Sequence, residues 1–402
     1  MGPSLPLSRR VVLAGAGGLT VAGALSACAS AGPDATPAAP APSPPSSTTA
    51  SGPPRTGPAP ALLPADPTPE QRRRVLVVGH RGAPGYRPEH TAASYELAAR
   101  MGADAVDVDL CPTRDGVLVA RHEPEIGATT DVAAHPEFAA RRTTRVIDGT
   151  PQEGWFTSDF TLAELKTLRA VERIPATRPH NTLYDRRFPV LTFDEVLDVL
   201  DGISAALGRP VGVLPEVKHS TYHRGIGLPV EPALVATLRR RGRDRPDSNV
   251  IIQSFETATL RELRGQVACP LLQLIDSSGV APADLVAAGD RRTFDDLVTP
   301  AGLAQVATYA TWIGPSKERI VPTAGGAPTT LVADARAAGL RTMPYTFRNE
   351  NEFLPTPLRR GGPGAPKDTY GDALAEYAQI YGLGVDALFS DNTDTAVLAL
   401  AL

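Results

Sequence analysis

The chain has 402 residues, of which 42% are hydrophobic and 21% charged, and its formal net charge is −4. No dense run of Lys and Arg lies in the body of the chain, which argues against electrostatic capture of nucleic acid, and we expect no nucleic-acid partner. The length suits one barrel of about 250 residues with extra segments, or two ordinary domains.

The N-terminus has the features of an export signal. Arg9 and Arg10 precede an apolar stretch from Val11 to Leu25, and Leu25-Ser26-Ala27-Cys28 ends it. This order matches a twin-arginine signal with a lipoprotein cleavage box. The stretch is shorter than the roughly 20 residues of a membrane-spanning helix. We predict that residues 1–28 are a signal peptide ending at a lipidated Cys28. The protein would then be exported to the outer face of the cell membrane or envelope, held there only by the lipid anchor or released as a secreted form.

Residues 29–68 are dominated by Pro, Ala, Ser, Thr and Gly. Such a segment buries too little apolar surface to offset its ordering entropy, so it predicts a disordered tether. No second break of this kind follows, and we interpret residues 69–402 as one main domain. That domain contains Cys111 and Cys269, each beside apolar residues, for which two buried free thiols are favoured over a disulfide.

Short apolar segments, β-branched and bounded by Gly or Pro, predict buried strands along this domain. They span 75–79, 104–110, 117–121, 211–217, 249–254, 271–275, 311–314, 341–346 and 385–390. Helical patterns lie between many of them, at 91–101, 192–207, 231–242, 256–265, 301–310, 329–339 and 371–382. Alternating strands and helices indicate a parallel sheet. Because polar residues gather at the carboxyl ends of about eight strands, a closed (β/α)8 TIM barrel is favoured over a doubly wound sheet.

Residues 123–190, here called the insertion, interrupt this alternation after the predicted strand that ends at His122. In a barrel, an insertion at that point would lie over the mouth of the active site. Its aromatic residues Trp155, Phe156 and Tyr184 could contact a substrate head group, but aromatic residues in an insertion more often form a small core of their own.

Two of the apolar segments end in histidine, at His80 and at His122. Between them lie Asp107 and Asp109, which are two residues apart on a predicted strand and therefore share one face. Glu216 supplies a third carboxylate at another strand end. The pattern indicates an acid/base pair beside a cation, and oxygen-only ligands favour Ca²⁺ or Mg²⁺ over zinc.

Six motifs follow one another along the chain: His80-Arg81-Gly82, Pro88-Glu89-His90-Thr91, Asp107-Val108-Asp109, Val119-Ala120-Arg121-His122-Glu123, Pro215-Glu216-Val217-Lys218 and Gln253-Ser254-Phe255. In this order they resemble the glycerophosphodiester phosphodiesterase family. The likeness is greatest to the exported bacterial branch, which carries Pro-Glu-His-Thr and a long insertion containing Thr-Asp-Val, here Thr130-Asp131-Val132. The resemblance covers roughly residues 70–400, with Trp312-Ile313-Gly314-Pro315, Pro344-Tyr345-Thr346-Phe347-Arg348 and Phe389-Ser390-Asp391 also in order.

The resemblance implies a metal-dependent TIM barrel that hydrolyses small glycerophosphodiesters to sn-glycerol 3-phosphate and an alcohol. It implies that His80 and His122 are the catalytic histidines. The expected ligands of a divalent ion, Ca²⁺ or Mg²⁺, are Asp107, Asp109 and Glu216. Many family members have Glu in place of Asp107, which makes the choice of cation less secure than its presence.

Further residues are assigned to substrate. The resemblance implies that Arg81 and Lys218 bind phosphate, and Gln253 and Tyr345 are candidates to reach the substrate. Glu89 is also a candidate, although it could instead orient Arg81 or serve the start of the next helix.

Three other functions fit parts of the pattern. A phospholipase D-like or phosphoinositide-cleaving enzyme would share the barrel and the histidine pair, but would need an apolar rim around the mouth, and no basic amphipathic helix suits that. A hydrolase of teichoic-acid-type polymers would suit an anchored enzyme. A non-catalytic binding protein would lack one of the five central residues, and all five are present. No protein partner is implied.

Overall fold

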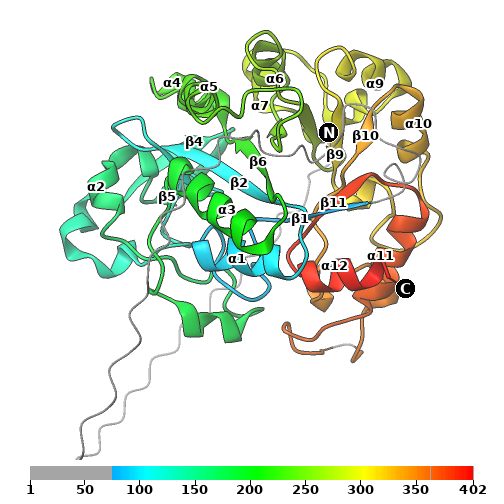
Figure 1. Cartoon of the computed structure of the whole chain (residues 1–402), viewed down its shortest axis with the longest axis horizontal. Coiled ribbons are helices and arrows are strands. Elements are labelled where there is room, and N and C mark those ends of the chain that lie inside the picture. Colours follow the sequence, from blue (N-terminus) through cyan, green and yellow to red (C-terminus); the bar gives the residue numbers. More distant parts are fainter. Residues whose placement is uncertain (1–74, 363, 402) are drawn as a thin grey trace, which may run out of the picture. The chain divides into compact units, whose positions relative to one another are not determined.

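The computed structural model describes residues 75–362 and 364–401. The predicted signal peptide, Cys28 and the tether lie outside the described residues. Eight parallel strands form the centre of the fold (Figure 1), hydrogen-bonded in the order β10-β9-β8-β7-β6-β2-β1-β11. They are β1 (Leu76–Gly79), β2 (Ala105–Pro112), β6 (Gly212–Val217), β7 (Ile252–Ser254), β8 (Leu271–Ile275), β9 (Trp312–Pro315), β10 (Arg341–Thr342) and β11 (Ala387–Ser390).

The two ends of this order are joined by main-chain hydrogen bonds. Phe347 N donates to Phe389 O over 2.9 Å, and Phe389 N donates to Pro344 O over 3.0 Å. The sheet is therefore a nearly closed barrel, which confirms the predicted (β/α)8 fold.

Helices cover the outside of the barrel (Figure 1). They are α1 (Ala92–Arg100), α3 (Phe193–Leu207), α4 (Ser220–Gly225), α5 (Val230–Arg240), α6 (Thr257–Arg264), α7 (Ala283–Ala287), α8 (Phe294–Leu297), α9 (Pro300–Val306), α10 (Leu331–Ala337), α11 (Ala373–Gly382) and α12 (Thr393–Ala399). Helix α3 shows why the boundaries fall where the sequence predicts them. Thr192 and Glu195 form a reciprocal capping box at its start, and Gly208 ends it in the left-handed conformation with φ 64°.

Side chains of β2 point alternately to two hydrophobic cores, one outside the barrel and one inside it. Val106 and Val108 point outward into the large core between strands and helices. Ala105 points inward and packs in a smaller core that fills the start of the barrel. Because side chains alternate along a strand, Asp107 and Asp109 share the inward face with Ala105. The smaller apolar core inside the barrel therefore ends at the level of these carboxylates.

The predicted strand at 117–121 is real but does not belong to the parallel series. It is β3 (Leu118–Ala120), which pairs antiparallel with β2 and lies outside the barrel order. The connection from β2 is a tight turn in which Thr113 N donates to Val117 O. A parallel crossover needs a dozen or more residues, so a turn this short permits only an antiparallel strand.

The insertion has an apolar cluster of its own. It contains a hairpin of β4 (Thr143–Ile147) and β5 (Thr150–Gly154) and the short helix α2 (Leu162–Leu165). Trp155 packs on a cluster that includes Phe138 and Phe160, and its indole donates to Phe138 O over 2.7 Å. Phe156 is buried, and the ring of Tyr184 lies under the Arg87 guanidinium. Trp155 therefore packs on the insertion's own small core, as in the second interpretation, whereas the half-buried Tyr184 packs on an arginine outside the insertion.

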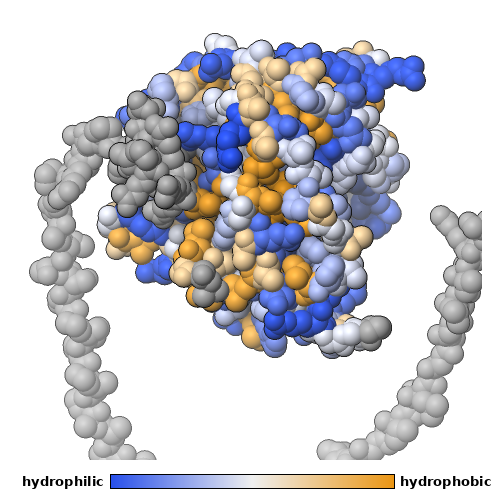
Figure 2. Space-filling model, turned by 90° about the vertical axis from the view of Figure 1, so that its right-hand side faces the viewer, coloured by the Kyte–Doolittle hydropathy of each residue, from blue (hydrophilic) through white to orange (hydrophobic). Residues whose placement is uncertain are grey.

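Cys111 and Cys269 are buried free thiols, as predicted. No helix within the described residues is both long enough and apolar enough to cross a membrane. Figure 2 shows one face of the molecule, where hydrophobic residues gather in a vertical band with hydrophilic residues on either side.

Candidate active site

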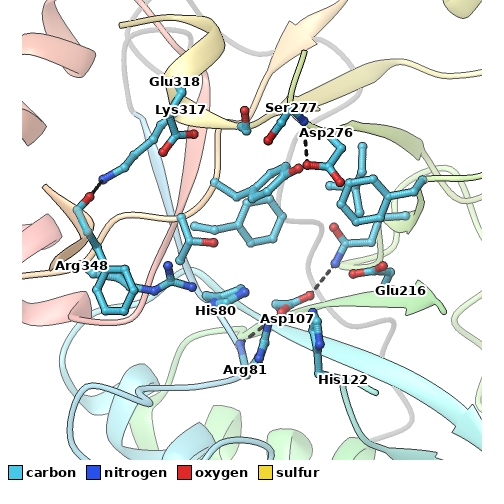
Figure 3. Close-up of a pocket in the computed structure, with 18 of the residues that line it drawn as sticks. His80, Arg81, Asp107, His122, Glu216, Asp276, Ser277, Lys317, Glu318 and Arg348 are labelled. Carbon is cyan, nitrogen blue, oxygen red and sulfur yellow. Dashed lines mark hydrogen bonds between the residues drawn. The ribbon is translucent and has the colours of Figure 1, made fainter. Parts of the chain in front are cut away.

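A cavity of about 340 Å³ lies at the carboxyl ends of the barrel strands (Figure 3). Seven of the ten predicted site residues line it: His80, Arg81, Asp107, His122, Glu216, Gln253 and Tyr345. Lys218 lines an adjoining cleft instead. Asp109 and Glu89 are buried beneath these walls. Residues spread over more than 260 positions of sequence thus converge on one site.

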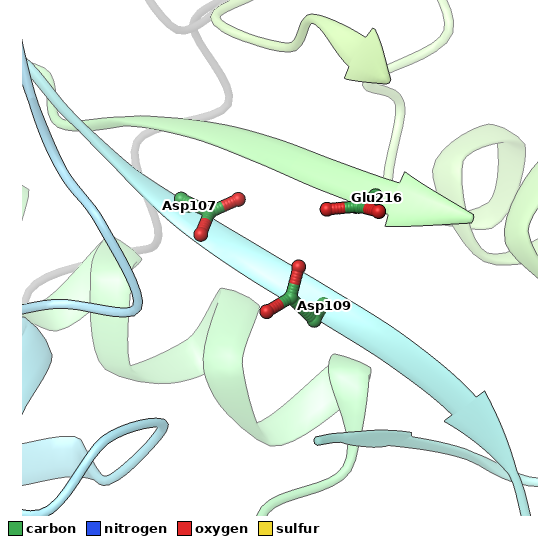
Figure 4. Close-up of side chains that lie close together, drawn as sticks. All are labelled: Asp107, Asp109 and Glu216. Atoms are coloured by element: carbon green, nitrogen blue, oxygen red, sulfur yellow. The ribbon is translucent and has the colours of Figure 1, made fainter. Parts of the chain in front are cut away.

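Three carboxylates lie close together (Figure 4): Asp107 and Glu216 line the cavity, and Asp109 is buried beneath it. Asp107 and Asp109 on β2 face Glu216 on β6, because the register of these parallel strands pairs Asp109 with Glu216. All three are buried, and one oxygen from each lies within 4.8 Å of the others. Asp109 Oδ1 has no hydrogen-bond partner. Buried, crowded oxygens with an unsatisfied lone pair are what a hard divalent cation requires, so these residues fit one.

The pKa values of the three carboxylates are shifted in different directions. Burial, followed by the charge of Asp109, raises the pKa of Asp107 well above its usual range. Burial likewise raises the pKa of Glu216. Burial also acts against the charged form of Asp109, but His122, Lys218 and His90 hold the pKa of Asp109 well below its usual value. Like charges at this distance oppose full ionisation of all three groups unless a cation lies among them.

Neighbouring side chains orient the triad. His90 Nε2 donates to Asp109 Oδ2 over 2.9 Å, and His90 Nδ1 lies 2.8 Å from the Tyr95 hydroxyl. The amide nitrogen of Gln253 donates to Asp107 Oδ1, and the backbone N–H of Arg81 donates to Asp107 Oδ2. His90, which belongs to the Pro88-Glu89-His90-Thr91 motif, thus holds one of the three carboxylates directly.

His80 follows β1 and is fixed by Asp391, the residue after β11. The two are joined by a 2.6 Å hydrogen bond between His80 Nδ1 and Asp391 Oδ1. A carboxylate can only accept, so Nδ1 carries the proton and Nε2 is left unprotonated. Burial, followed by the charge of Arg81, lowers the pKa of His80 to about 4 although Asp391 acts in the opposite direction. The imidazole is therefore neutral at neutral pH and suited to take up a proton.

Asp391 itself is buried between two arginines. Arg178 Nη2 lies 2.6 Å from Asp391 Oδ2 and Arg348 Nε lies 2.8 Å from it. These cations and His80 outweigh the effect of burial and hold the pKa of Asp391 well below its usual range. Arg178 comes from the insertion, and it also pairs with the buried Glu350.

His122 lies between a carboxylate and an ammonium group. Lys218 Nζ is 3.2 Å from His122 Nε2 and 3.0 Å from Glu216 Oε1. An ammonium group can only donate, so His122 Nε2 accepts and its proton is on Nδ1, which lies 2.7 Å from Glu123 Oε1. Burial, followed by the charges of Arg81 and Lys218, lowers the pKa of His122 to about 3.

Arg81 reaches the cavity wall from a left-handed backbone position with φ 56°. Its Nη1 donates to Glu89 Oε2 over 3.0 Å, and the same oxygen lies 3.0 Å from Arg173 Nε. Glu89 lines neither of the two clefts. Of the roles predicted for Glu89, the structure favours the one in which it orients Arg81 over direct contact with substrate.

Sequence reasoning assigned no role to Asp391, Arg178, Glu123 or Lys317. Asp391 stands directly after a strand, like His80, and that position was the available signal. Lys317 likewise follows β9 and lines the cavity, and its ammonium group pairs over 2.7 Å with Glu376, which does not line the cavity. Arg178 lies in a 3-10-rich stretch of the insertion, where no periodic pattern marks it.

The fold and site define a parallel barrel whose mouth holds two neutral histidines beside a carboxylate triad, an arrangement suited to a metal-assisted hydrolase. Residues 80–395 match the model of the glycerophosphoryl diester phosphodiesterase family. The chain therefore belongs to that family, and it is an enzyme, a phosphoric diester hydrolase, as the sequence predicts.

Individual relatives agree. A glycerophosphodiester phosphodiesterase of Arabidopsis thaliana is 35% identical over 343 residues, which cover 81% of this chain and 86% of the relative. One from Haemophilus influenzae is 26% identical, over 80% of this chain and 88% of its own. Among solved structures, an Oleispira antarctica phosphodiesterase in complex with its product sn-glycerol-3-phosphate has a TM-score of 0.53 at 18% identity, over 81% of this chain and 97% of that one. At that identity the likeness supports the barrel fold alone.

Proposed function

We propose that this enzyme hydrolyses glycerophosphodiesters to sn-glycerol 3-phosphate and an alcohol, with a divalent cation and the histidine pair His80 and His122. The observation that carries the proposal is their placement: both imidazoles line the cavity beside the three buried carboxylates. The family relatives named for this activity support the choice of substrate class.

Asp107, Asp109 and Glu216 would hold the cation, either Ca²⁺ or Mg²⁺. When bound, such an ion supplies Lewis-acid stabilisation of the negative charge that develops on the phosphoryl oxygens. Arg81 presents a planar guanidinium to the same phosphate and Lys218 a point charge. Gln253 and Tyr345 complete the wall, and Tyr345 is held by a hydrogen bond from its hydroxyl to Ile275 O.

The two histidines divide the proton transfers. His80 Nε2 is free to accept the proton of the attacking hydroxyl, since Asp391 occupies Nδ1. His122 gives a proton to the leaving alkoxide from its protonated form. The ring takes up that proton at Nε2 once Lys218, which donates to Nε2 in the free enzyme, turns to the phosphate and keeps its own charge. The imidazolium that forms on His80 is stabilised by Asp391, in the way that a carboxylate stabilises the histidine of a hydrolase triad.

The test is turnover of glycerophosphocholine by the full-length chain, coupled to detection of glycerol 3-phosphate. We expect activity that a chelator abolishes and that Ca²⁺ or Mg²⁺ restores. His80→Ala should lose activity, whereas the matched variant His135→Ala, at a histidine of the insertion that pairs with Asp131 and Glu137, should keep it. Chelator-resistant turnover, or equal activity in both variants, would refute the proposal.

The proposed location rests on the N-terminal sequence alone: export by a twin-arginine signal and lipidation of Cys28. A Cys28→Ser variant should lose incorporation of radiolabelled palmitate and move from the membrane fraction to the soluble fraction. Retention of the label in that variant would overturn the lipoprotein assignment.

A further inference from the structure

A second cleft of about 650 Å³ adjoins the catalytic cavity. The two share part of their walls: His122, Glu216, Phe255, Asp276 and Tyr345 line both. His80 and Arg81, by contrast, line only the first. Glu216, one of the three carboxylates, thus stands with His122 at a junction from which two separate compartments lead outward.

The two compartments differ in chemistry. Away from the junction, the catalytic cavity is lined by many charged and hydroxyl side chains, such as Lys317, Arg348 and Ser316, with Phe353 and Leu354 among them. The second cleft has an apolar rim that comes from the β4–β5 hairpin and from the loop and helix after β8. It consists of Val146, Val280, Ala281, Pro282, Ala283, Val286 and Ala287.

The rim exposes apolar surface to solvent. Val146 is 60% exposed, Val280 41% and Val286 62%. These are three of the eight large hydrophobic residues that are exposed in the described part of the chain, and all three lie on this one cleft. Single exposed valines need no explanation, but a cluster at the edge of a catalytic site indicates an apolar ligand.

The wall formed by the hairpin is held in place by ionic contacts. Asp148 at its tip lies 2.6 Å from His219 Nδ1, and His219 Nε2 lies 3.4 Å from Glu123 Oε2. Glu123 in turn lies 2.7 Å from the catalytic His122. The apolar rim is therefore tied to the same side of the site on which the leaving alkoxide would receive its proton.

We propose that the second cleft binds the leaving alcohol, and that it selects alcohols with an extended apolar portion. In-line displacement at phosphorus places the entering and leaving groups on opposite sides of the phosphate. The smaller polar cavity on the His80 side then takes the glycerol, and the larger apolar cleft on the His122 side takes the alcohol. The inference rests on the proposed function and adds a substrate class: glycerophosphodiesters of alkyl-chain alcohols.

A series of synthetic diesters tests it with the full-length enzyme. Glycerophosphoethanol, -butanol, -hexanol and -octanol differ only in the length of the alcohol, and each is assayed below its micelle-forming concentration. Removing a methylene from water gains up to about fourfold in binding, so kcat/KM should rise about two- to fourfold per methylene until the cleft is filled. A glycerophosphocholine with a hexanoyl chain on its glycerol should gain nothing over glycerophosphocholine.

Variants locate the effect. Val286→Asp and, independently, Val146→Asp should flatten the dependence on chain length, because each puts a charge on the apolar rim at an exposed position where folding is not at stake. Leu398→Asp, at a 52% exposed leucine of α12 that lines neither cleft, should keep it.

The outcomes separate the two proposals. Turnover of glycerophosphoethanol with no rise along the series overturns the inference and leaves the proposed function standing. A gain from the chain on glycerol in place of the chain on the alcohol also overturns it. No turnover of any diester overturns both.

Discussion

Replacing Asp391 by Asn tests whether a residue that does not line the cavity controls His80, the proposed base. The carboxylate accepts hydrogen bonds from His80 Nδ1, Arg178 and Arg348, and it is 2% exposed. The amide can keep the shape of the site but carries no charge to stabilise an imidazolium ion. A hydrogen bond to a charged group contributes about 1.5–3 kcal/mol, so we expect kcat to fall about 10- to 150-fold.

The pH profile distinguishes orientation of His80 from general damage. The charge of Asp391 and its hydrogen bond both raise the pKa of His80. Removing them lowers that pKa further, so the acid limb of kcat/KM should move to lower pH. Asp394→Asn, three residues along the chain at an exposed aspartate that accepts from the Tyr86 hydroxyl, serves as the control and should move neither kcat nor the acid limb.

Stability must be measured alongside, since the substitution takes a negative charge away from the buried Arg178 and the half-buried Arg348. Breaking a buried ion pair costs about 3–5 kcal/mol, although Arg178 keeps Glu350 at 2.7 Å. Urea denaturation at the assay temperature shows whether both variants are folded there. A folded Asp391→Asn enzyme with unchanged kcat and an unmoved acid limb would refute the role assigned to Asp391.

Two further predictions concern the cation and a buried histidine. Glu216→Gln should weaken Ca²⁺ and Mg²⁺ binding at least about tenfold in calorimetric titrations, because it removes one charged oxygen ligand. Glu318→Gln, on the same cavity wall, should leave the affinity unchanged. Equal affinities in the two variants would contradict the assignment of Glu216 as a ligand of the cation. Burial lowers the pKa of His223 from 6.5 to about 3, so below pH 6.5 the unfolded chain takes up a proton that the folded chain does not, and stability falls as pH falls. Between pH 7.5 and 5 this amounts to about 2 kcal/mol, which His223→Leu should abolish in urea denaturation; an identical loss in both proteins would contradict it.

The carboxylate triad was predictable because it depends on local geometry and one strand pairing. Alternation of Asp107 and Asp109 with Val106 and Val108 fixes their shared face, and Glu216 stands at the end of the adjacent strand. The barrel followed in the same way, since each strand is a short apolar segment with a turn residue at its boundary.

The orientation of β3 was predictable in principle and missed. An apolar segment does not indicate whether its strand runs parallel or antiparallel to its neighbour. His122 at the end of β3 also resembles His80 at the end of β1. The direction is set by the short connection from β2 and by the Thr113–Val117 turn. Antiparallel return is also what brings His122 back over the carboxylates, because Ala120 pairs with Leu110, the residue after Asp109.

The charge cluster behind His80 could not be found from sequence. Arg178 and Asp391 are separated by 213 positions, and each lies in a segment whose local pattern says nothing about the other. A buried carboxylate is stable only when cations neutralise it, and here one of the two arginines comes from the insertion. The insertion therefore contributes to the charge cluster behind His80. It supplies a charge that keeps Asp391 ionised, and Asp391 in turn orients His80, the proposed base.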